Sequence, residues 1–275
     1  MLLARDYHRT VRHFFFKRFP GPYLAIHSIA ARVLFGGRTL SVRRDARRAI
    51  FGAEKTPQVK AGPFRGMRYD VGHTWGLPTN KWLGTYEAEL NPVVEEIVQL
   101  NPTDIFDIGC AEGYYAVGLA RRLPSARVWA FDADPISLWQ CRRLARANGV
   151  SSRVKLRGFC TPESLGRVLT ERSLIVCDIE GGEIDVLDPK RIPMLRQCWL
   201  LIETHQLGVG PEWSGARLRE RFSATHFAHE IKQQPRHPAL IGSDFIERPN
   251  DAAIVNWMDE MRSPEQAWLW LTPKT

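Results

Sequence analysis

The segment Asp107-Ile108-Gly109-Cys110-Ala111-Glu112-Gly113 decides which fold this chain is predicted to have. It follows a short apolar segment, Asp104–Ile108, and precedes a helical pattern from Tyr114 to Leu123. A strand that enters a glycine-containing turn and then a helix is typical of the first unit of a doubly wound α/β sheet. In such sheets a nucleotide-like ligand lies across the carboxyl ends of the strands, and glycine lets the backbone approach it closely.

The sequence on either side of this segment predicts the rest of the sheet. Apolar strands alternate with helical stretches at the spacing of βαβ units, which predicts a Rossmann-like α/β fold with a mostly parallel sheet. Further strands are expected at 127–131, 154–156, 174–177, 199–202 and 227–231, a seventh within 251–262, helices at 85–100 and 136–148, and a hairpin with a loop at 61–80.

Charge divides the chain into two parts. The net charge is +8, and residues 1–50 contain eleven Lys and Arg but only two Asp and Glu, so the remainder is close to neutral. We expect a basic helical N-terminal extension over residues 1–60 and the main domain over residues 61–275. The extension is interpreted first as a solvated helical cap. An anionic partner surface, a dimerisation arm and a lid remain open, and residue types do not choose among them.

Composition favours a cytoplasmic protein, with a peripheral membrane location left open by the basic extension. No apolar run approaches the roughly 20 residues that a transmembrane helix needs, because His27 and Arg32 interrupt the longest one. The five cysteines are widely spaced and form no Cys-x-x-Cys pair, so they are expected to be reduced thiols. The oligomeric state cannot be predicted from these features.

The charges around the glycine turn indicate which cofactor it binds. A dinucleotide site has the spacing Gly-x-Gly-x-x-Gly and leaves a helix N-terminus free for the pyrophosphate. Here the spacing is Gly-x-x-x-Gly, and Asp107 and Glu112 would repel a pyrophosphate. They suit S-adenosyl-L-methionine, which carries an ammonium and a sulfonium and no phosphate. Asp132, 19 residues beyond Gly113, is placed to accept hydrogen bonds from the ribose hydroxyls. The predicted cofactor-binding residues here are Asp107, Gly109, Cys110, Ala111, Glu112, Gly113, Tyr114, Asp132 and Ala133.

Further along the chain, the motifs resemble those of the FkbM-like family of class I S-adenosylmethionine-dependent methyltransferases. The matching residues are Asp107–Gly113, Phe131-Asp132 with Asp134-Pro135, Cys177–Glu183 with Val186-Leu187, Leu201–His205 and Lys81–Glu87. The resemblance covers roughly residues 60–235. It implies a seven-stranded sheet whose last strand is antiparallel, and methylation of hydroxyls on sugars and natural products.

Four side chains are the predicted catalytic set. Asp178 and Glu180 follow one predicted strand, while Glu203 and His205 end the next, and the carboxyl ends of neighbouring strands face the same crevice. His205 is the first choice as general base because the ordinary histidine pKa of about 6.5 is near the working pH. The alternatives are helix capping by Asp178 and Glu180 and an ion pair between Glu203 and an arginine such as Arg196. The four could also bind a divalent metal, but the spacing does not require one and none is assigned.

Two more segments are expected near the cofactor. Tyr86 could close over its methionine end, Lys81 could reach its carboxylate, and Cys160 and Thr161 fall where adenine is contacted. The predicted function is O-methylation of a hydroxyl on a sugar, glycolipid or secondary metabolite, with a small-molecule, glycan or peptide acceptor. The alternatives are an N- or carboxyl-methyltransferase acting on a peptide or small molecule, an RNA methyltransferase that uses the basic extension, and a non-catalytic binding module.

Overall fold

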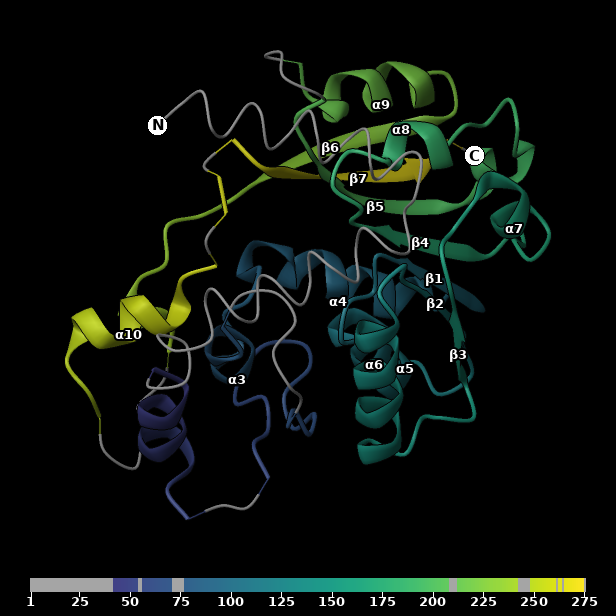
Figure 1. The fold of residues 1–275 in the computed structure, drawn as a ribbon. Coiled ribbons are helices and arrows are strands. Elements are labelled where there is room, and N and C mark those ends of the chain that lie inside the picture. Colours follow the sequence, from purple (N-terminus) through teal and green to yellow (C-terminus); the bar gives the residue numbers. More distant parts are fainter. Residues whose placement is uncertain are drawn as a thin grey trace.

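One seven-stranded sheet forms the centre of the structure, a computed structural model that describes residues 42–53, 56–70, 77–207, 212–241, 248–260, 262–263 and 265–274. The strand order is β3-β2-β1-β4-β5-β7-β6 (Figure 1). Strand β7 is antiparallel to both neighbours, and the other pairs are parallel. The predicted Rossmann-like fold is therefore confirmed. The strands are β1 (Asp104–Ile108), β2 (Arg127–Phe131), β3 (Val154–Arg157), β4 (Ser173–Cys177), β5 (Trp199–Thr204), β6 (His226–Lys232) and β7 (Ala267–Pro273).

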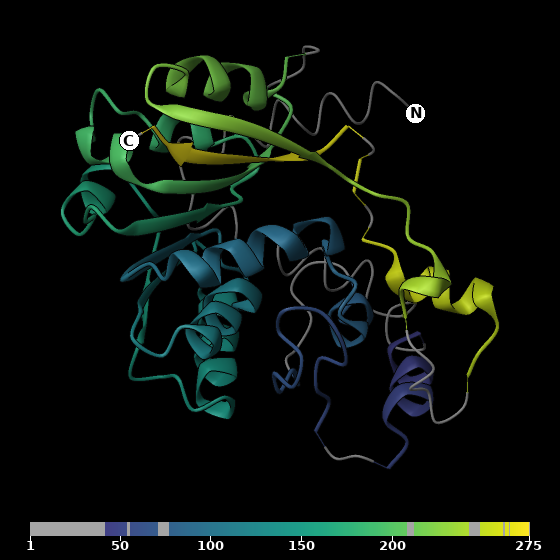
Figure 2. The same ribbon diagram turned by 180° about the vertical axis from the view of Figure 1, so that it is seen from behind.

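Helices cover both faces of the sheet, with a separate hydrophobic core on each (Figures 1 and 2). Successive strand residues point to opposite faces, so Ile105 of β1 belongs to one core and Phe106 to the other. This explains why the central strands are apolar at every position rather than at alternate ones. One face carries α4 (Asn91–Leu100), α5 (Tyr114–Arg122) and α6 (Pro135–Ala147), and the other α7 (Pro162–Gly166), α8 (Glu183–Val186) and α9 (Ser214–Phe222).

Three helices from distant parts of the chain form a group beside the sheet (Figures 1 and 2). They are the helix over residues 42–51, α3 (Thr79–Leu83) and α10 (Asp251–Met258). Phe51 packs edge-on against Trp82 at 5.5 Å, and the Thr79 hydroxyl donates to the Trp257 carbonyl at 2.6 Å. The described part of the predicted extension thus packs against the main domain. Its residues 1–41 lie outside the described residues.

Two predicted elements are wrong in position. The seventh strand was expected within 251–262, but α10 occupies most of that segment and β7 begins at Ala267. Asn250 caps α10 by accepting from the Ala253 amide at 2.9 Å, and a helical face of Ile254, Trp257 and Met258 is buried. The helix expected at 85–100 is α4, which starts only at Asn91 after a short 3-10 helix, Ala88–Leu90. Glu87 and Glu89 therefore do not lie in its first turn.

The segment predicted as a hairpin and loop contains less regular structure than expected. Its described residues form one isolated antiparallel bridge, between Gln58 and Arg68, and then α3.

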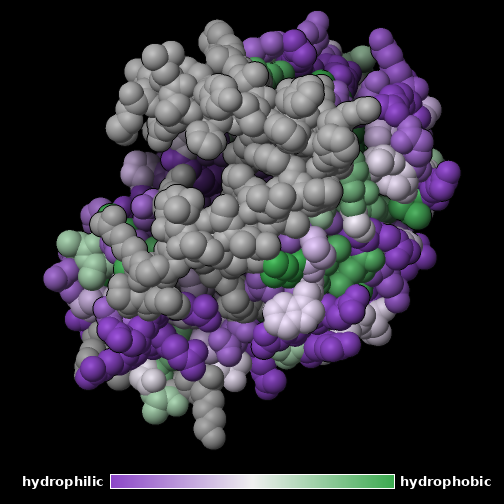
Figure 3. All heavy atoms as spheres, viewed as in Figure 1, coloured by the Kyte–Doolittle hydropathy of each residue, from purple (hydrophilic) through white to green (hydrophobic). Residues whose placement is uncertain are grey.

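Most described side chains on the face in Figure 3 are hydrophilic, with small hydrophobic groups among them. No helix in the described residues is long and apolar enough to cross a bilayer.

Candidate active site

The glycine turn after β1 packs against the ends of two other strands. The amides of Gly109 and Cys110 both donate to the Phe131 carbonyl at 2.9 Å, which holds the turn against the end of β2. The Asp178 amide donates to the Ile108 carbonyl at 2.9 Å, which places the end of β4 on its other side. Gly109 has φ 86°, and a Cβ there would lie 1.7 Å from the Asp178 carbonyl oxygen. The turn thus requires glycine both for its conformation and for space.

Two of the predicted acids hold the turn in place. Asp107 accepts from the Ala116 amide at 2.8 Å, and Asp132 accepts from the amides of Ala111 at 2.8 Å and Asp134 at 2.7 Å. Burial, outweighing these hydrogen bonds, raises the pKa of Asp107 to about 7 and that of Asp132 to about 6. Each carboxylate oxygen can accept a second hydrogen bond. The half-buried Asp132 therefore keeps acceptor capacity for a ribose, and Ala133 follows it in the same loop.

Lys81 and Tyr86 lie beside the turn, but Lys81 is already paired. Its ammonium donates to Glu112, which also accepts from the Tyr69 hydroxyl, and it lies 4.4 Å from the centre of the Tyr86 ring. Tyr114, the first residue of α5, packs against Tyr86 at 5.3 Å. The negative charge that the sequence assigned to the cofactor's ammonium is neutralised here by Lys81. Lys81 was predicted to reach the cofactor's carboxylate, but in the structure it neutralises Glu112.

Cys160 and Thr161 lie after β3 as expected, at the start of α7. The Thr161 hydroxyl accepts from the Ser164 amide at 3.2 Å, and the Ser164 hydroxyl accepts from the Thr161 amide at 2.9 Å, forming a capping box. Burial raises the pKa of the Cys160 thiol to about 12. The Thr161 hydroxyl is thus already engaged by helix α7, and the thiol stays protonated.

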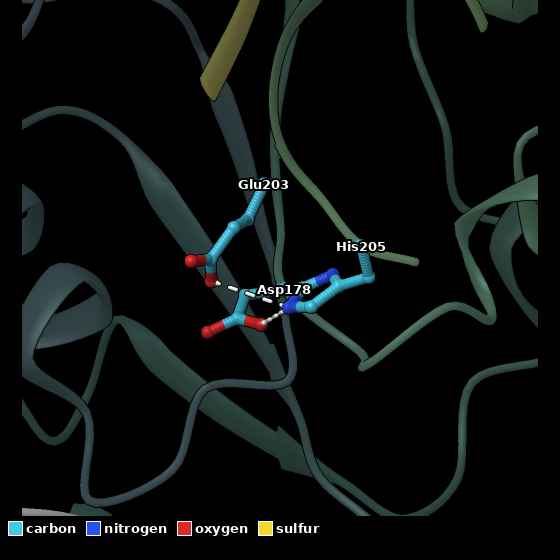
Figure 4. A group of neighbouring side chains, drawn as sticks. All are labelled: Asp178, Glu203 and His205. Atoms are coloured by element: carbon cyan, nitrogen blue, oxygen red, sulfur yellow. Dashed lines mark ion pairs between the residues drawn. The ribbon is translucent and has the colours of Figure 1, made fainter. Parts of the chain in front are cut away.

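Three of the four predicted catalytic side chains converge where β4 and β5 end (Figure 4). The Nε2 atom of His205 lies 3.5 Å from Oδ1 of Asp178 and 3.6 Å from Oε2 of Glu203. Asp178 is the open member of the group, since 36% of its side chain is exposed against 7% for His205. Glu180 is exposed, with φ 57°, and does not join the cluster.

Sequence reasoning assigned no role to Glu183, the residue that orients His205. Oε1 of Glu183 lies 2.9 Å from Nδ1 of His205 and also accepts from the amides of Ile179 and Gly181 at 3.2 Å. Glu183 was quoted only as part of the family motif. Its position at the start of α8 turns the side chain back beneath the loop after β4, a contact that strand periodicity does not reveal.

The acids around His205 change its protonation. Burial alone lowers the pKa of the imidazole, but the hydrogen bond and charge of Glu183, together with Glu203 and Glu180, outweigh burial and raise it to about 9. Burial and the charge of Glu180 raise the pKa of Asp178 to about 8. At neutral pH this favours the protonated imidazole, so His205 departs from the ordinary pKa on which its choice as general base was based.

Two arginines that the sequence analysis did not select complete the site. Arg262 donates to Glu203 and lies 3.4 Å from Glu89 and 3.6 Å from Glu87. Arg236 lies 2.7 Å from both Glu89 and Glu260. Both arginines come from the connection between β6 and β7, which also carries α10. An arginine partner for Glu203 was one of the open alternatives, but the partner is Arg262 and not Arg196, the example considered.

Comparison with known proteins identifies partial relatives. No protein-family model matches the chain. Over 91 residues, 32% of the chain and 28% of the relative, it is 38% identical to a release factor glutamine methyltransferase of Chlorobaculum tepidum. Over 59 residues, 22% of the chain and 18% of the relative, it is 41% identical to a ribosomal protein L11 methyltransferase of Herpetosiphon aurantiacus. The matched segments thus cover less than a third of either relative.

Solved structures with similar folds are distant. A precorrin-6y C5,15-methyltransferase from Geobacter metallireducens has a TM-score of 0.44 at 12% identity, over 67% of this chain and 89% of that one. An O-methyltransferase from Bacillus cereus in complex with SAH has a TM-score of 0.44 at 14% identity, over 66% and 79%. Similarity at this level carries no argument about activity. The strand order and the reversed β7 are themselves those of the class I S-adenosylmethionine-dependent methyltransferases, and this chain has that fold.

Proposed function

We propose that the chain is an S-adenosylmethionine-dependent methyltransferase that methylates a hydroxyl on a sugar, glycolipid or secondary metabolite. One observation carries the proposal: the backbone of Asp178 packs against Gly109 in the cofactor turn, and its partly exposed side chain belongs to the cluster with Glu203 and His205. The cluster therefore lies immediately beside the place where a cofactor would bind. Names of the two partial relatives agree with methyl transfer.

The cofactor would bind along the turn, with Asp132 accepting from its ribose hydroxyls. A neutral ribose suits the remaining acceptor capacity of Asp132, whereas a dinucleotide would bring its pyrophosphate against the acids at this turn. Gly109 and Gly113, both at positive φ, let the turn pack against Asp178 and Cys141, where a side chain on either glycine would clash. The same proposal includes membership of the FkbM-like family, which is inferred from the sequence motifs.

The chemistry requires a hydroxyl held in line with the methyl group. The acceptor oxygen forms a bond to the methyl carbon as the carbon–sulfur bond breaks, and the sulfur keeps the electron pair as a thioether. The hydroxyl proton leaves to the cluster of Asp178, Glu203 and His205. Asp178 is the member that an acceptor can reach, and its raised pKa of about 8 makes its ionised form a better proton acceptor than an ordinary carboxylate.

The second candidate is transfer to a nitrogen or carboxylate on a peptide. The relatives' names, which refer to a release factor and a ribosomal protein, favour a protein acceptor. A carboxylate acceptor needs no base, so Asp178→Asn should leave its methylation nearly unchanged while it slows methylation of a hydroxyl. Comparing this variant on hydroxyl and carboxylate acceptors separates methylation of a hydroxyl from methylation of a carboxylate.

The first test is calorimetric titration of the full chain with S-adenosylhomocysteine, with NADH as the comparison ligand. We expect saturable binding of the former only, weakened at least tenfold by Asp132→Asn. This substitution keeps an oxygen that can accept a backbone hydrogen bond but removes the charge. Asp188→Asn, in a surface turn where the carboxylate accepts from the Lys190 amide, is the control and should bind like the parent. Absence of binding, or binding of NADH, would overturn the proposal.

A further inference from the structure

The cluster at the ends of β4 and β5 has the spacing of a metal-binding site. Ligand atoms of Asp178, Glu203 and His205 all lie within 4.8 Å of one another, and Nε2 of His205 is 3.5 Å and 3.6 Å from the two carboxylates. Ligands about 2.1 Å from one ion stand roughly 3.0–3.4 Å apart at octahedral or tetrahedral angles. A small inward movement of each side chain would therefore complete three bonds to one ion.

Neighbouring side chains already orient two of these ligands toward the centre. Glu183 lies 2.9 Å from Nδ1 of His205, which favours the proton on Nδ1 and points Nε2 at the carboxylates. A carboxylate behind a histidine is the usual outer contact of a metal-bound imidazole. Arg262 donates to Oε1 of Glu203 and leaves Oε2 facing His205.

The open side of the cluster leaves room for further ligands. Asp178 is one-third exposed, whereas the side chains of Glu203 and His205 are almost wholly buried. An ion held here would keep positions for water or for an acceptor oxygen. Glu180, considered as a fourth ligand from sequence, is exposed and is not part of the cluster.

Charge in the surrounding network independently favours a cation. When every group is counted as ionised, the described residues joined by these ion pairs include six carboxylates and three cationic groups, a formal excess of three negative charges. Buried charge of one sign is costly unless it is compensated. The carboxylates are Glu87, Glu89, Asp178, Glu183, Glu203 and Glu260, and the cationic groups are His205, Arg236 and Arg262.

We propose that Asp178, Glu203 and His205 bind one divalent cation of the Mg²⁺ or Mn²⁺ class, with Glu183 as the positioning residue for His205. Two carboxylates with one imidazole form a mostly hard ligand set, which suits these ions. The ion's role rests on the proposed function: it would displace the Nε2 proton of His205, bind the acceptor hydroxyl and lower its pKa, so that the hydroxyl proton leaves to water while Asp178 and His205 serve as ligands.

The test is direct Mn²⁺ binding to the full chain, measured by electron paramagnetic resonance and calorimetry, with Mg²⁺ as competitor. We expect one Mn²⁺ per chain, displaced by excess Mg²⁺, and at least tenfold weaker binding in Asp178→Asn and His205→Ala. Glu183→Gln should weaken binding by roughly 10- to 100-fold, as removal of an outer contact does elsewhere. The control is Asp188→Asn, whose carboxylate accepts from the Lys190 amide in a surface turn outside the cluster, and its affinity should stay within about twofold of the parent.

Circular dichroism spectra must show that each variant is folded. Among the variants expected to lose binding, Asp178→Asn changes the most exposed side chain and is therefore the least prone to misfold. No stoichiometric Mn²⁺ binding by the parent, or binding that survives both Asp178→Asn and His205→Ala, would overturn the metal site. Titration with S-adenosylhomocysteine in metal-free buffer separates the two proposals. If the chain binds S-adenosylhomocysteine but not Mn²⁺, only the proposed metal site is rejected. If it binds Mn²⁺ but not S-adenosylhomocysteine, only the proposed methyltransferase function is rejected.

Discussion

The carbonyl oxygen of Asp178 occupies the space that a side chain on Gly109 would need, since a Cβ there would lie 1.7 Å away. The glycine turn after β1 and the loop after β4, which carries Asp178, are thus in direct backbone contact. A displacement of either one must move the other, so binding at the turn and the geometry of the cluster are expected to be linked.

Gly109→Ala should destabilise the protein and abolish binding of S-adenosylhomocysteine. The new methyl would force the turn and the Asp178 loop apart, in addition to the cost of about 1 kcal/mol for alanine at positive φ. Gly149→Ala is the matched control, because Gly149 has φ 70° but a Cβ there meets nothing within 4 Å. Thermal unfolding should show a clearly larger loss for Gly109→Ala. Equal losses in the two variants would show that the contact with Asp178 is unimportant.

Stability of the metal-free, cofactor-free protein should fall as the pH rises from about 5 to 9. The pKa of Asp107 is raised to about 7 and that of His205 to about 9, so the folded state holds protons that the unfolded chain releases. The contribution of His205 is complete below its ordinary pKa of about 6.5 and is lost as the pH passes 9. Melting temperatures across this range check the trend. Asp107→Asn should flatten the slope between pH 5 and 7, and a rise in stability with pH would contradict the assignment.

Glu183→Gln should lower the pKa of His205 from about 9 toward its ordinary value, by more than one unit. The substitution keeps a hydrogen-bond acceptor for Nδ1 but removes the charge that stabilises the imidazolium. Histidine NMR titration in metal-free buffer measures the change. His226 serves as an internal control in the same spectra, because it bonds to the Cys198 carbonyl at 2.9 Å and makes no contact with Glu183 among those described. An unchanged His205 would mean that Glu183 does not set its protonation.

Arg262→Met should cost about 3–5 kcal/mol of unfolding free energy, because it leaves buried carboxylates without their cation. Arg262 lies against Glu203, Glu87 and Glu89, and its side chain is almost wholly buried. Arg217→Met is the control, since the Arg217–Glu212 pair is about half exposed and should contribute at most about 1 kcal/mol. Urea unfolding of both variants gives the comparison. A loss for Arg262→Met no larger than the control would show that the network is not held together by this arginine.

Local sequence patterns were sufficient to predict the strands around the glycine turn and the two acids beside it. The strands around the glycine turn, together with Asp107 and Asp132, are adjacent in sequence to the turns that place them, so their positions follow from periodicity and glycine spacing. Strand β7 was misplaced because α10 is apolar enough to be mistaken for a strand when only a short segment is read. Length, capping by Asn250 and packing against α3 decide the matter, and the last of these is a tertiary effect.

The cluster at the ends of β4 and β5 was only partly predictable from the sequence. Asp178, Glu203 and His205 were expected together because the ends of β4 and β5 are neighbours, and the structure brings them together. The protonation of His205 depends on Glu183, and the environment of Glu203 depends on Arg262, which is 59 residues away in sequence. Contacts of this kind leave no periodic signal in one sequence, so neither the pKa nor the ion-pair network could be derived from it.

Strand β7 follows both β5 and β6 in the sequence but lies between them in the sheet. Among the described strands β6 pairs only with β7, so its place in the sheet depends on insertion of β7, which follows the segment containing Arg262. Until that insertion, Glu203 at the end of β5 faces its neighbours without Arg262. Docking of β7 and pairing of Glu203 with Arg262 are thus coupled, and a chain that has assembled only its first five strands would have the glycine turn without this ion pair.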